Sequence, residues 1–351
     1  MSQGVISVGL FSGDDGIVIG AAAKKRLVYL DSNIWIDLAE RDLAVAEQCR
    51  MAVRTGKVLF PVSTPAVTEV FDQPDTVQRS HVAALMDELC GGVSFRPTSF
   101  IHALEAELAL TVLLGGDVTG ISRDKILCWI AECFAKMNIN IPPSWDQTKA
   151  EKFIREFPQQ PELRSVRWFA DQYPADQMLA RKKEQDNRYV ERMTASIKEG
   201  AMRVQPMAKD QRWRQLLLEE RMWAVNKFVR PSIASYPTKV AGSEDAMAEV
   251  VRRVEEGSEE RFNRPMAVMP SLDLFCHIMA ERRRDPARKV YRQDFHDVEH
   301  AIVGGAYADF FVTSDGHLFD LLTQRCSIPA ARGCRIVRGV KGLEEILKSR
   351  D

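Results

Sequence analysis

Four acidic residues, far apart in the 351-residue chain, lie where strands or helices of the predicted fold begin or end. They are Asp31, Glu69, Asp297 and Asp315. Ligands of open parallel sheets collect at the carboxyl ends of the strands, so these carboxylates are expected to converge. Because carboxylates in one pocket repel each other, a hard divalent cation such as Mg²⁺ is the natural compensator.

Mg²⁺ binds through a few carboxylates together with waters and substrate phosphates, which suits phosphodiester hydrolysis. Asn33, Thr313 and Ser314 are expected to support the ligands or to contact substrate phosphates. Asp294 lies three residues before Asp297 on the same predicted helix face, so these two compete for the role of third acid.

Each acid also has a simpler interpretation. Asp31 suits the N-cap of the helix that follows it. Glu69 suits an early helical position, where an acid interacts favourably with the helix dipole. Asp315 precedes Gly316 and suits a turn or a cap. Only the joint occurrence of all four acids favours a metal site.

The elements around these acids alternate between strand and helix. Strands are predicted at 26–31, 57–63, 93–97, 309–315 and 334–340. This alternation predicts an α/β fold, a three-layer α/β/α sandwich with a central parallel sheet.

The predicted helices carry start and stop signals. Residues from about 32 to Thr55 are expected to form one helix. Thr64 is expected to cap the next, with Pro65 at its first position. A helix over 76–92 ends on a glycine pair. For residues 1–25, which lack the basic start of a signal peptide, a β-hairpin around "SGDDG" or an irregular tail is expected.

From about 112 to 290 the sequence predicts no strand, only helical periodicity. The simplest organisation is an N-terminal extension (1–25), an α/β domain in two parts (26–110 and 290–351) and a mainly helical insertion lobe (111–289).

The composition of the chain indicates where the protein is located and which partners it is expected to have. Net charge is −1, which argues against a global field that attracts nucleic acid or membrane. The seven cysteines are scattered without a CxxC pair, which is typical of reduced thiols in a cytoplasmic protein. No apolar stretch approaches the length of a membrane span. We therefore expect a cytoplasmic protein with no membrane partner.

Other catalytic classes have little support. His296, His300 and His317 lack the spacing of a zinc ligand set. The chain has no GxSxG motif, and its glycines do not form a phosphate-binding loop with a following lysine.

Two stretches are basic. Residues 181–230 hold thirteen Lys and Arg against seven Asp and Glu, which favours a solvated helical face over an RNA surface. The run "ERRRDPARKVYR" (281–292) leads into the helix of Asp297, where a basic approach would guide a polyanion. The residues expected to bind nucleic acid are Arg282, Arg283, Arg284 and Arg292.

The segments "YLDSNIWIDL", "STPAVTEV", "HDVEHAIVGGAYADFFVTSDGHL" and "CRIV" resemble the ordered motifs of PIN-domain nucleases. The resemblance implies that Asp31, Glu69, Asp297 and Asp315 bind Mg²⁺ or Mn²⁺ for cleavage of single-stranded RNA. It favours Asp297 over Asp294, because His300 completes a D-x-x-H-like step. Asp294 and His300 then join Asn33, Thr313 and Ser314 as residues that support the ligands or contact substrate, although ordinary helix packing is the alternative for His300.

The expected function is therefore a metal-dependent endoribonuclease with RNA as substrate. One alternative is a catalytically silent RNA-binding or scaffold protein whose acids only cap and pair. Another is a toxin or effector nuclease controlled by an inhibitory or regulatory protein partner. A homodimer also stays open.

Overall fold

The computed structural model describes most of the chain. The described residues are 5–6, 15–116, 118, 120–133, 139–140, 146, 148–149, 161–172, 175–229, 231, 263, 265–284, 287, 289–291 and 293–349. They fall into two compact units. The first comprises Met1–Pro97, Arg123–Ala175 and Gly339–Asp351, and the second comprises Thr98–Ser122 and Asp176–Arg338. These boundaries differ from those expected at 110 and 290.

A parallel strand pair lies in the first unit. β2 (Arg26–Leu30) runs parallel to β3 (Val58–Leu59), with Arg26 opposite Val58 and Leu27 opposite Leu59. The last four residues of β2 have no exposed surface, as expected for a strand covered on both faces. The strands predicted over 26–31 and 57–63 are thus confirmed, the second in shortened form.

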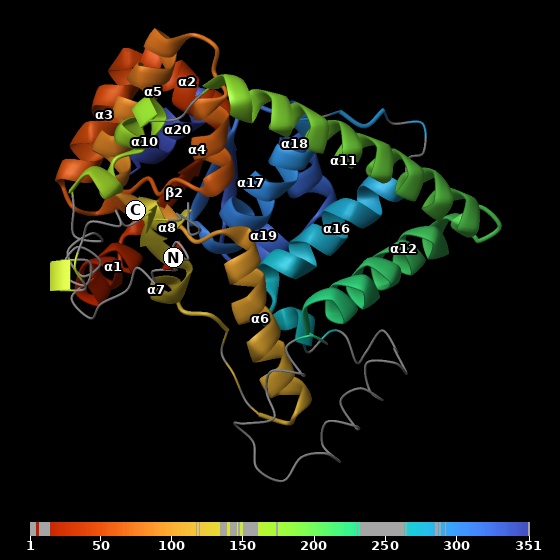
Figure 1. Cartoon of the computed structure of the whole chain (residues 1–351). Helices are drawn as coiled ribbons and strands as arrows, with labels where there is room; N and C mark the ends of the chain where they lie inside the picture. Colours follow the sequence, from red (N-terminus) through yellow and green to blue (C-terminus); the bar gives the residue numbers. More distant parts are fainter. Residues whose placement is uncertain are drawn as a thin grey trace. The chain divides into compact units, whose positions relative to one another are not determined.

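Helices lie near this pair, and Figure 1 labels them beside β2. They include α2 (Ser32–Glu40), α3 (Leu43–Arg54), α4 (Thr64–Phe71), α5 (Thr76–Cys90) and α20 (Gly339–Lys348). α2 packs against α5 and α3, and α3 packs against α20. The prediction of a single helix from about 32 to 55 is wrong. This segment forms two helices, because the amides of Arg41 and Asp42 both donate to the carbonyl of Asp37 and end the hydrogen-bond pattern of α2.

The caps of α4 and α5 differ in how well they were predicted. Ser63, not Thr64, caps α4: its backbone is extended and its hydroxyl accepts the Ala66 amide at 3.4 Å. Thr64 is already helical, so Pro65 occupies the second helical position. α5 ends as predicted, at Gly91, whose φ of 57° is left-handed and favours glycine.

The third predicted strand has an unexpected partner. β4 (Val93–Phe95) pairs antiparallel with β5 (Leu127–Trp129), and one parallel bridge joins Ser94 to Val62. β6 (Ile139–Asn140) pairs antiparallel with β1 (Val5–Ile6). The expectation of no strand between 112 and 290 is therefore wrong. These strands of two or three residues are too short to show a period-two pattern.

The N-terminal segment contains a helix. α1 (Asp15–Ala23) occupies part of the region where a hairpin or an irregular tail was expected, and its Ile19 and Ala22 are buried. The predicted hairpin is wrong at Asp15 and Gly16, because both residues belong to α1. Residues 12–14 lie outside the described part of the chain. The other helices of this unit are α7 (Arg123–Ile126), α8 (Ile130–Cys133), the 3-10 helix η2 (Pro161–Arg164) and α10 (Val166–Gln172).

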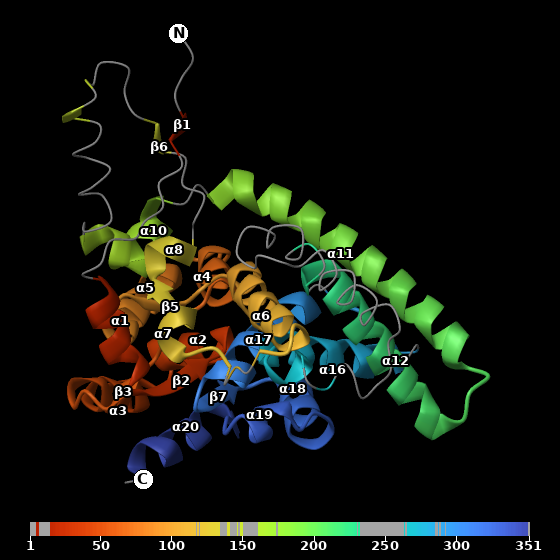
Figure 2. The same cartoon turned by 90° about the horizontal axis from the view of Figure 1, so that it is seen from below.

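The second unit is mainly helical. The helices that precede its strand pair include α6 (Thr98–Leu113), α11 (Ala175–Val204, entering the unit at Asp176), α12 (Lys209–Ala224), the π-helix η3 (Val225–Val229), α16 (Pro270–Arg284) and α17 (Gln293–Tyr307). α16 packs against both α12 and α17, and Figures 1 and 2 show it beside both. Its buried Leu272 and Cys276 belong to a core shared with Leu216 of α12 and Ala109 of α6.

A second parallel strand pair lies in this unit. β7 (Phe310–Thr313) pairs with β8 (Arg335–Arg338), from Phe310 opposite Arg335 to Thr313 opposite Arg338. Between them come α18 (Gly316–Asp320), the π-helix η4 (Leu321–Arg325) and α19 (Ile328–Ala331). The predicted order of helix, strand, helix and strand is confirmed here.

Both units thus combine parallel strands with helices, and the protein is mostly helical, which is compatible with an α/β fold. No helix within the described ranges has the length and apolar character needed to cross a bilayer.

Candidate functional site

Asp31 lies where β2 ends and α2 begins. Its backbone is extended, and its Oδ1 accepts the Asn33 amide at 3.0 Å, which makes it the N-cap of α2. Asp31 is 6% exposed as a residue, whereas Asn33 is exposed. The capping interpretation of Asp31 is therefore confirmed.

Asp315 occupies the equivalent place after β7. Its backbone is also extended, and its Oδ1 accepts the Leu318 amide at 2.6 Å as the N-cap of α18. The Asp315 amide in turn donates to Oγ1 of the buried Thr313 at 3.0 Å, whereas Ser314 is exposed. Each unit therefore contains one junction in which a buried parallel strand leads into an aspartate that caps the next helix.

Glu69 lies in the second turn of α4 and is half-buried. The helix dipole acts mainly within the first turn, so it explains an acid here less well than one closer to the cap. The start of α4 is tied to β2, because the hydroxyls of Ser63 and Tyr29 hydrogen bond at 2.6 Å.

Asp294 and Asp297 have different surroundings on α17. Asp294 is buried: its Oδ2 accepts the Tyr291 amide at 2.8 Å, and its Oδ1 lies 3.2 Å from Arg282. These bonds give Asp294 a structural role at the start of the helix. Asp297 is half-buried, and His300 lies buried one turn further on. Asp297 is therefore the better candidate for a metal-binding acid.

The described residues contain no group of three or more His, Cys, Asp or Glu side chains placed to hold a metal ion. Such a group is more than Mg²⁺ requires, because this ion is commonly bound by one or two carboxylates together with waters and substrate phosphates. The hard oxygen donors of Asp31 and Asp315 fit Mg²⁺ or Mn²⁺ in kind. The four predicted acids are all among the described residues, and no three of them form such a group. A ligand set of four carboxylates therefore stays a prediction.

The basic run before α17 is not the surface that the sequence predicted. Arg282 is 5% exposed, bonds the Asp294 carboxylate and donates to its carbonyl oxygen at 2.7 Å. It therefore holds α16 to α17 and is unsuited to phosphate binding. Arg284 is exposed and bonds Glu281 at 3.3 Å. Arg292 lies outside the described residues.

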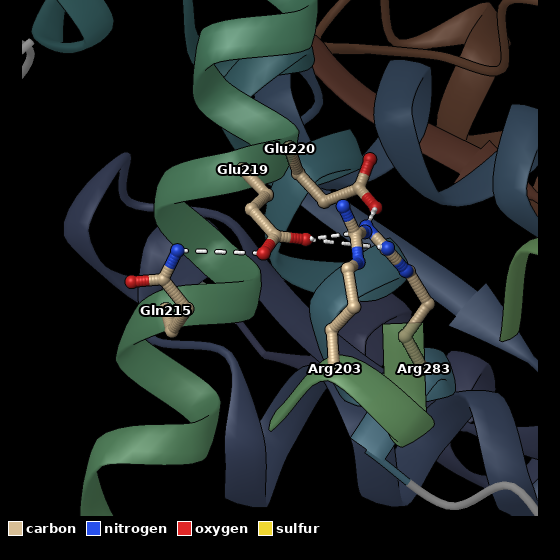
Figure 3. A network of polar contacts seen from close by, with 5 residues as sticks. All are labelled: Arg203, Gln215, Glu219, Glu220 and Arg283. Atoms are coloured by element: carbon tan, nitrogen blue, oxygen red, sulfur yellow. Dashed lines mark hydrogen bonds and ion pairs between the residues drawn. The ribbon is translucent and has the colours of Figure 1, made fainter. Parts of the chain in front are cut away.

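Arg283 is buried in a polar network of three helices, which Figure 3 shows. Its Nη1 lies 2.6 Å from Oε1 of Glu220, and its Nη2 lies 3.3 Å from Oε2 of Glu219. Glu219 also accepts bonds from Arg203 at 2.8 Å and from Gln215 at 3.3 Å. The network joins α11, α12 and α16, so the prediction that Arg283 binds nucleic acid is wrong.

Sequence reasoning missed the most deeply buried acid described. Glu105 of α6 accepts the amides of Ser271 and Leu272 at 2.8 and 3.0 Å, and it also accepts the hydroxyl of Tyr307. Burial raises its pKa to about 7, although these bonds act in the opposite direction. The available signal was its position three residues after His102, on the apolar face of "IHALEAELAL".

No family model matches the chain, and no curated protein or solved structure matches it either.

Proposed function

We propose that the protein is a metal-dependent ribonuclease that hydrolyses phosphodiester bonds of single-stranded RNA. In this proposal the fold is PIN-like, and the carboxylates of Asp31, Glu69, Asp297 and Asp315 serve Mg²⁺ or Mn²⁺. The single observation that carries it is the repeated junction of parallel strand, capping aspartate and helix at Asp31 and Asp315. We also propose a cytoplasmic location, where reduced cysteines are typical.

The junction supports this function for a physical reason. A carboxylate fixed by a backbone amide loses little further side-chain entropy when it binds an ion, so the ligand is preorganised. Carboxyl ends of parallel strands are also where α/β folds commonly bind their ligands. A divalent cation at such a position would supply a Lewis acid and an activated water for phosphodiester hydrolysis. In the same proposal, Asn33, Thr313 and Ser314 orient the carboxylates or contact the phosphates.

The test combines labelled single-stranded RNA with the full chain in Mn²⁺ and in EDTA. Asp31→Asn and Asp315→Asn are the informative variants, because asparagine keeps the N-cap bond while it removes the charge. We expect each to lower the cleavage rate by more than about 100-fold, at the upper end of the loss for residues that only support metal ligands.

Asp37→Asn is the matched control, because Asp37 lies on the same helix α2 and forms an i, i+4 pair with Arg41. Its cleavage rate should stay within twofold of the unmodified protein, as expected for removal of an ordinary surface charge. Cleavage that persists in EDTA, or that both site variants retain, would overturn the proposal.

A second candidate is a catalytically silent RNA-binding or scaffold protein. It is favoured by the observation that Asp31 and Asp315 are both used as helix caps. RNA binding without metal-dependent turnover, and with no change when either aspartate becomes asparagine, would favour this candidate.

A further inference from the structure

A groove of about 420 Å³ lies in the second unit, and neither capping aspartate is among its lining residues. Three cationic side chains line it: Lys198 of α11, Arg212 of α12 and Arg284 at the end of α16. Met202 and Gln205 form part of its wall, and no acidic residue is among the described residues that line it.

The positive charge of the groove is only partly compensated. Arg212 donates to two carbonyl oxygens, from Nε to Met207 at 3.0 Å and from Nη2 to Gln205 at 2.7 Å, so its bonds neutralise no charge. Arg284 bonds Glu281, which also pairs with Arg325 at 3.5 Å. Lys198 is exposed, and within the described ranges it has no ion-pair partner. A net positive concavity of this kind attracts anions.

The three helices that carry these cations are fixed to one another beside the groove. Arg283 bonds Glu219 and Glu220 of α12, and Arg203 of α11 bonds the same Glu219 (Figure 3). Gly200 of α11 faces the Arg283 guanidinium so closely that an added Cβ would lie 2.5 Å from its Nε. This packing fixes the backbone positions from which the cations extend before any ligand arrives, which lowers the entropic cost of binding.

We propose that this groove binds the phosphate backbone of single-stranded RNA and forms the docking surface of the proposed nuclease. The inference rests on the proposed function for its choice of RNA over other anions. Cationic side chains that contact phosphates fix a strand without reading its sequence, and the exposed Met202 offers an apolar surface to a base. Of the four arginines predicted to bind nucleic acid, Arg284 is the one described as lining this groove.

The test measures binding of a fluorescent single-stranded RNA oligonucleotide by anisotropy in EDTA, over a range of salt concentrations. The variants are Lys198→Gln, Arg284→Gln and their combination. Each lost phosphate contact should reduce the slope of log K against log salt by about 0.7. The double variant should therefore lose about 1.4 in slope and at least about 10-fold in affinity at low salt.

The matched control is Lys24→Gln with Lys341→Gln, which removes two exposed charges from the first unit. Its affinity should stay within about twofold, because contacts rather than net charge carry the effect. Far-UV circular dichroism and the melting temperature verify folding. Lys198→Glu, a reversal at an exposed site, keeps the test valid if Arg284→Gln unfolds.

Equal losses of affinity in the double variant and its control would overturn the inference. Polyglutamate that binds as tightly as RNA would overturn the assignment to RNA. Cleavage in Mn²⁺ separates this inference from the proposed function. Groove-dependent binding without cleavage overturns only the nuclease, whereas cleavage with an unchanged KM in the double variant overturns only the groove.

Discussion

Arg282 and Asp294 form a buried ion pair in which Nη2 of the guanidinium lies 3.2 Å from Oδ1 of the carboxylate, with side chains 5% and 6% exposed. The same guanidinium donates to the Asp294 carbonyl oxygen, and Oδ2 accepts the Tyr291 amide. The pair thereby fixes the first turn of α17 to α16. Because Asp297 lies in the next turn, the pair also determines where that carboxylate is held.

Removing one member of this pair should be strongly destabilising. Arg282→Gln leaves the Asp294 carboxylate buried without its cation, so the free energy of unfolding should fall by about 3–5 kcal/mol. Urea denaturation measures it. Arg284→Gln, two residues further and exposed, should change stability by less than about 0.5 kcal/mol. Similar losses for the two variants would contradict a structural role for Arg282.

Replacing both members together removes both buried charges, so that neither is left without a partner. Arg282→Met combined with Asp294→Leu removes both charges, so the double variant should be more stable than Arg282→Gln. A double variant as unstable as the single one would show that the bonds to backbone atoms, rather than the ion pair, dominate.

The buried Glu105 should make stability depend on pH. Its pKa is about 7 in the folded protein, against an ordinary value of 4.5, so the folded state keeps a proton that the unfolded state loses. The contribution of the protonated Glu105 carboxyl to the free energy of unfolding is complete below pH 4.5. It is lost as the pH rises to about 7, because the unfolded state then ionises more readily than the folded state. The loss is on the order of 3 kcal/mol.

Glu105→Gln should remove this component of the pH profile, measured by urea denaturation between pH 4.5 and 8. Glu107→Gln is the control, because Glu107 is exposed on the same helix. A Glu105→Gln profile parallel to that of the unmodified protein would show that the buried carboxyl does not titrate in this window.

His102 should act in the opposite direction. Burial lowers its pKa from 6.5 to about 4, and its ring packs at a steep angle on Phe228, with centroids 4.9 Å apart. Between pH 6.5 and 4 the His102 imidazole is therefore protonated in the unfolded state but stays neutral in the folded state. The free energy of unfolding falls as the pH falls through this range.

His102→Phe should remove this loss, on the order of 3 kcal/mol at pH 4 relative to pH 7. Thermal unfolding at both pH values measures it. His81→Phe is the control, because His81 is exposed and pairs with Glu40 on the surface. Acid sensitivity that His102→Phe leaves unchanged would rule out His102 as its source.

Gly200→Ala should destabilise the protein, although alanine normally favours a helix by about 1 kcal/mol over glycine. The added Cβ would lie 2.5 Å from Nε of Arg283, whose guanidinium is held by Glu219 and Glu220. Overpacking of this kind costs about 1–3 kcal/mol. In an Arg283→Met background the same change should cost less, and a double-mutant cycle measures the difference. An equal cost in both backgrounds would contradict the assigned contact.

Metal binding should be visible in stability as well as in cleavage. If Mn²⁺ binds the folded chain at the proposed acidic site, a concentration 100 times its Kd should stabilise the protein by about 2.7 kcal/mol. A thermal shift measures this, and Asp31→Asn should abolish it while Asp37→Asn should not. A shift of equal size in all three proteins would place the ion elsewhere.

Much of the local structure could be predicted from the sequence. Four consecutive apolar residues before Asp31 are enough to predict β2, and the glycine after Cys90 predicts the end of α5. The cap at Asp31 was one of two interpretations that the sequence offered, because aspartate is a favoured residue directly before a helical pattern. These features depend on near neighbours in the chain.

The remaining features depend on residues brought together from afar. The antiparallel partner of β4 comes from a run of three residues more than thirty positions later, which carries no periodic signal. The basic run at 281–292 looks like a surface in sequence, yet Arg282 and Arg283 are buried because acids from α17 and α12 meet them.

The sequence by itself determined the alternation of strands and helices within the two terminal segments, and it offered helix capping as one of two roles for Asp31 and Asp315. Only the tertiary structure decided which charges are buried, that Asp294 is structural, and that Glu105 lies in an apolar core. The physical reason is the sequence separation over which each interaction acts. Secondary-structure propensity and helix capping depend on residues only a few positions apart. Burial and ion pairing depend on which distant side chains fill the surrounding space.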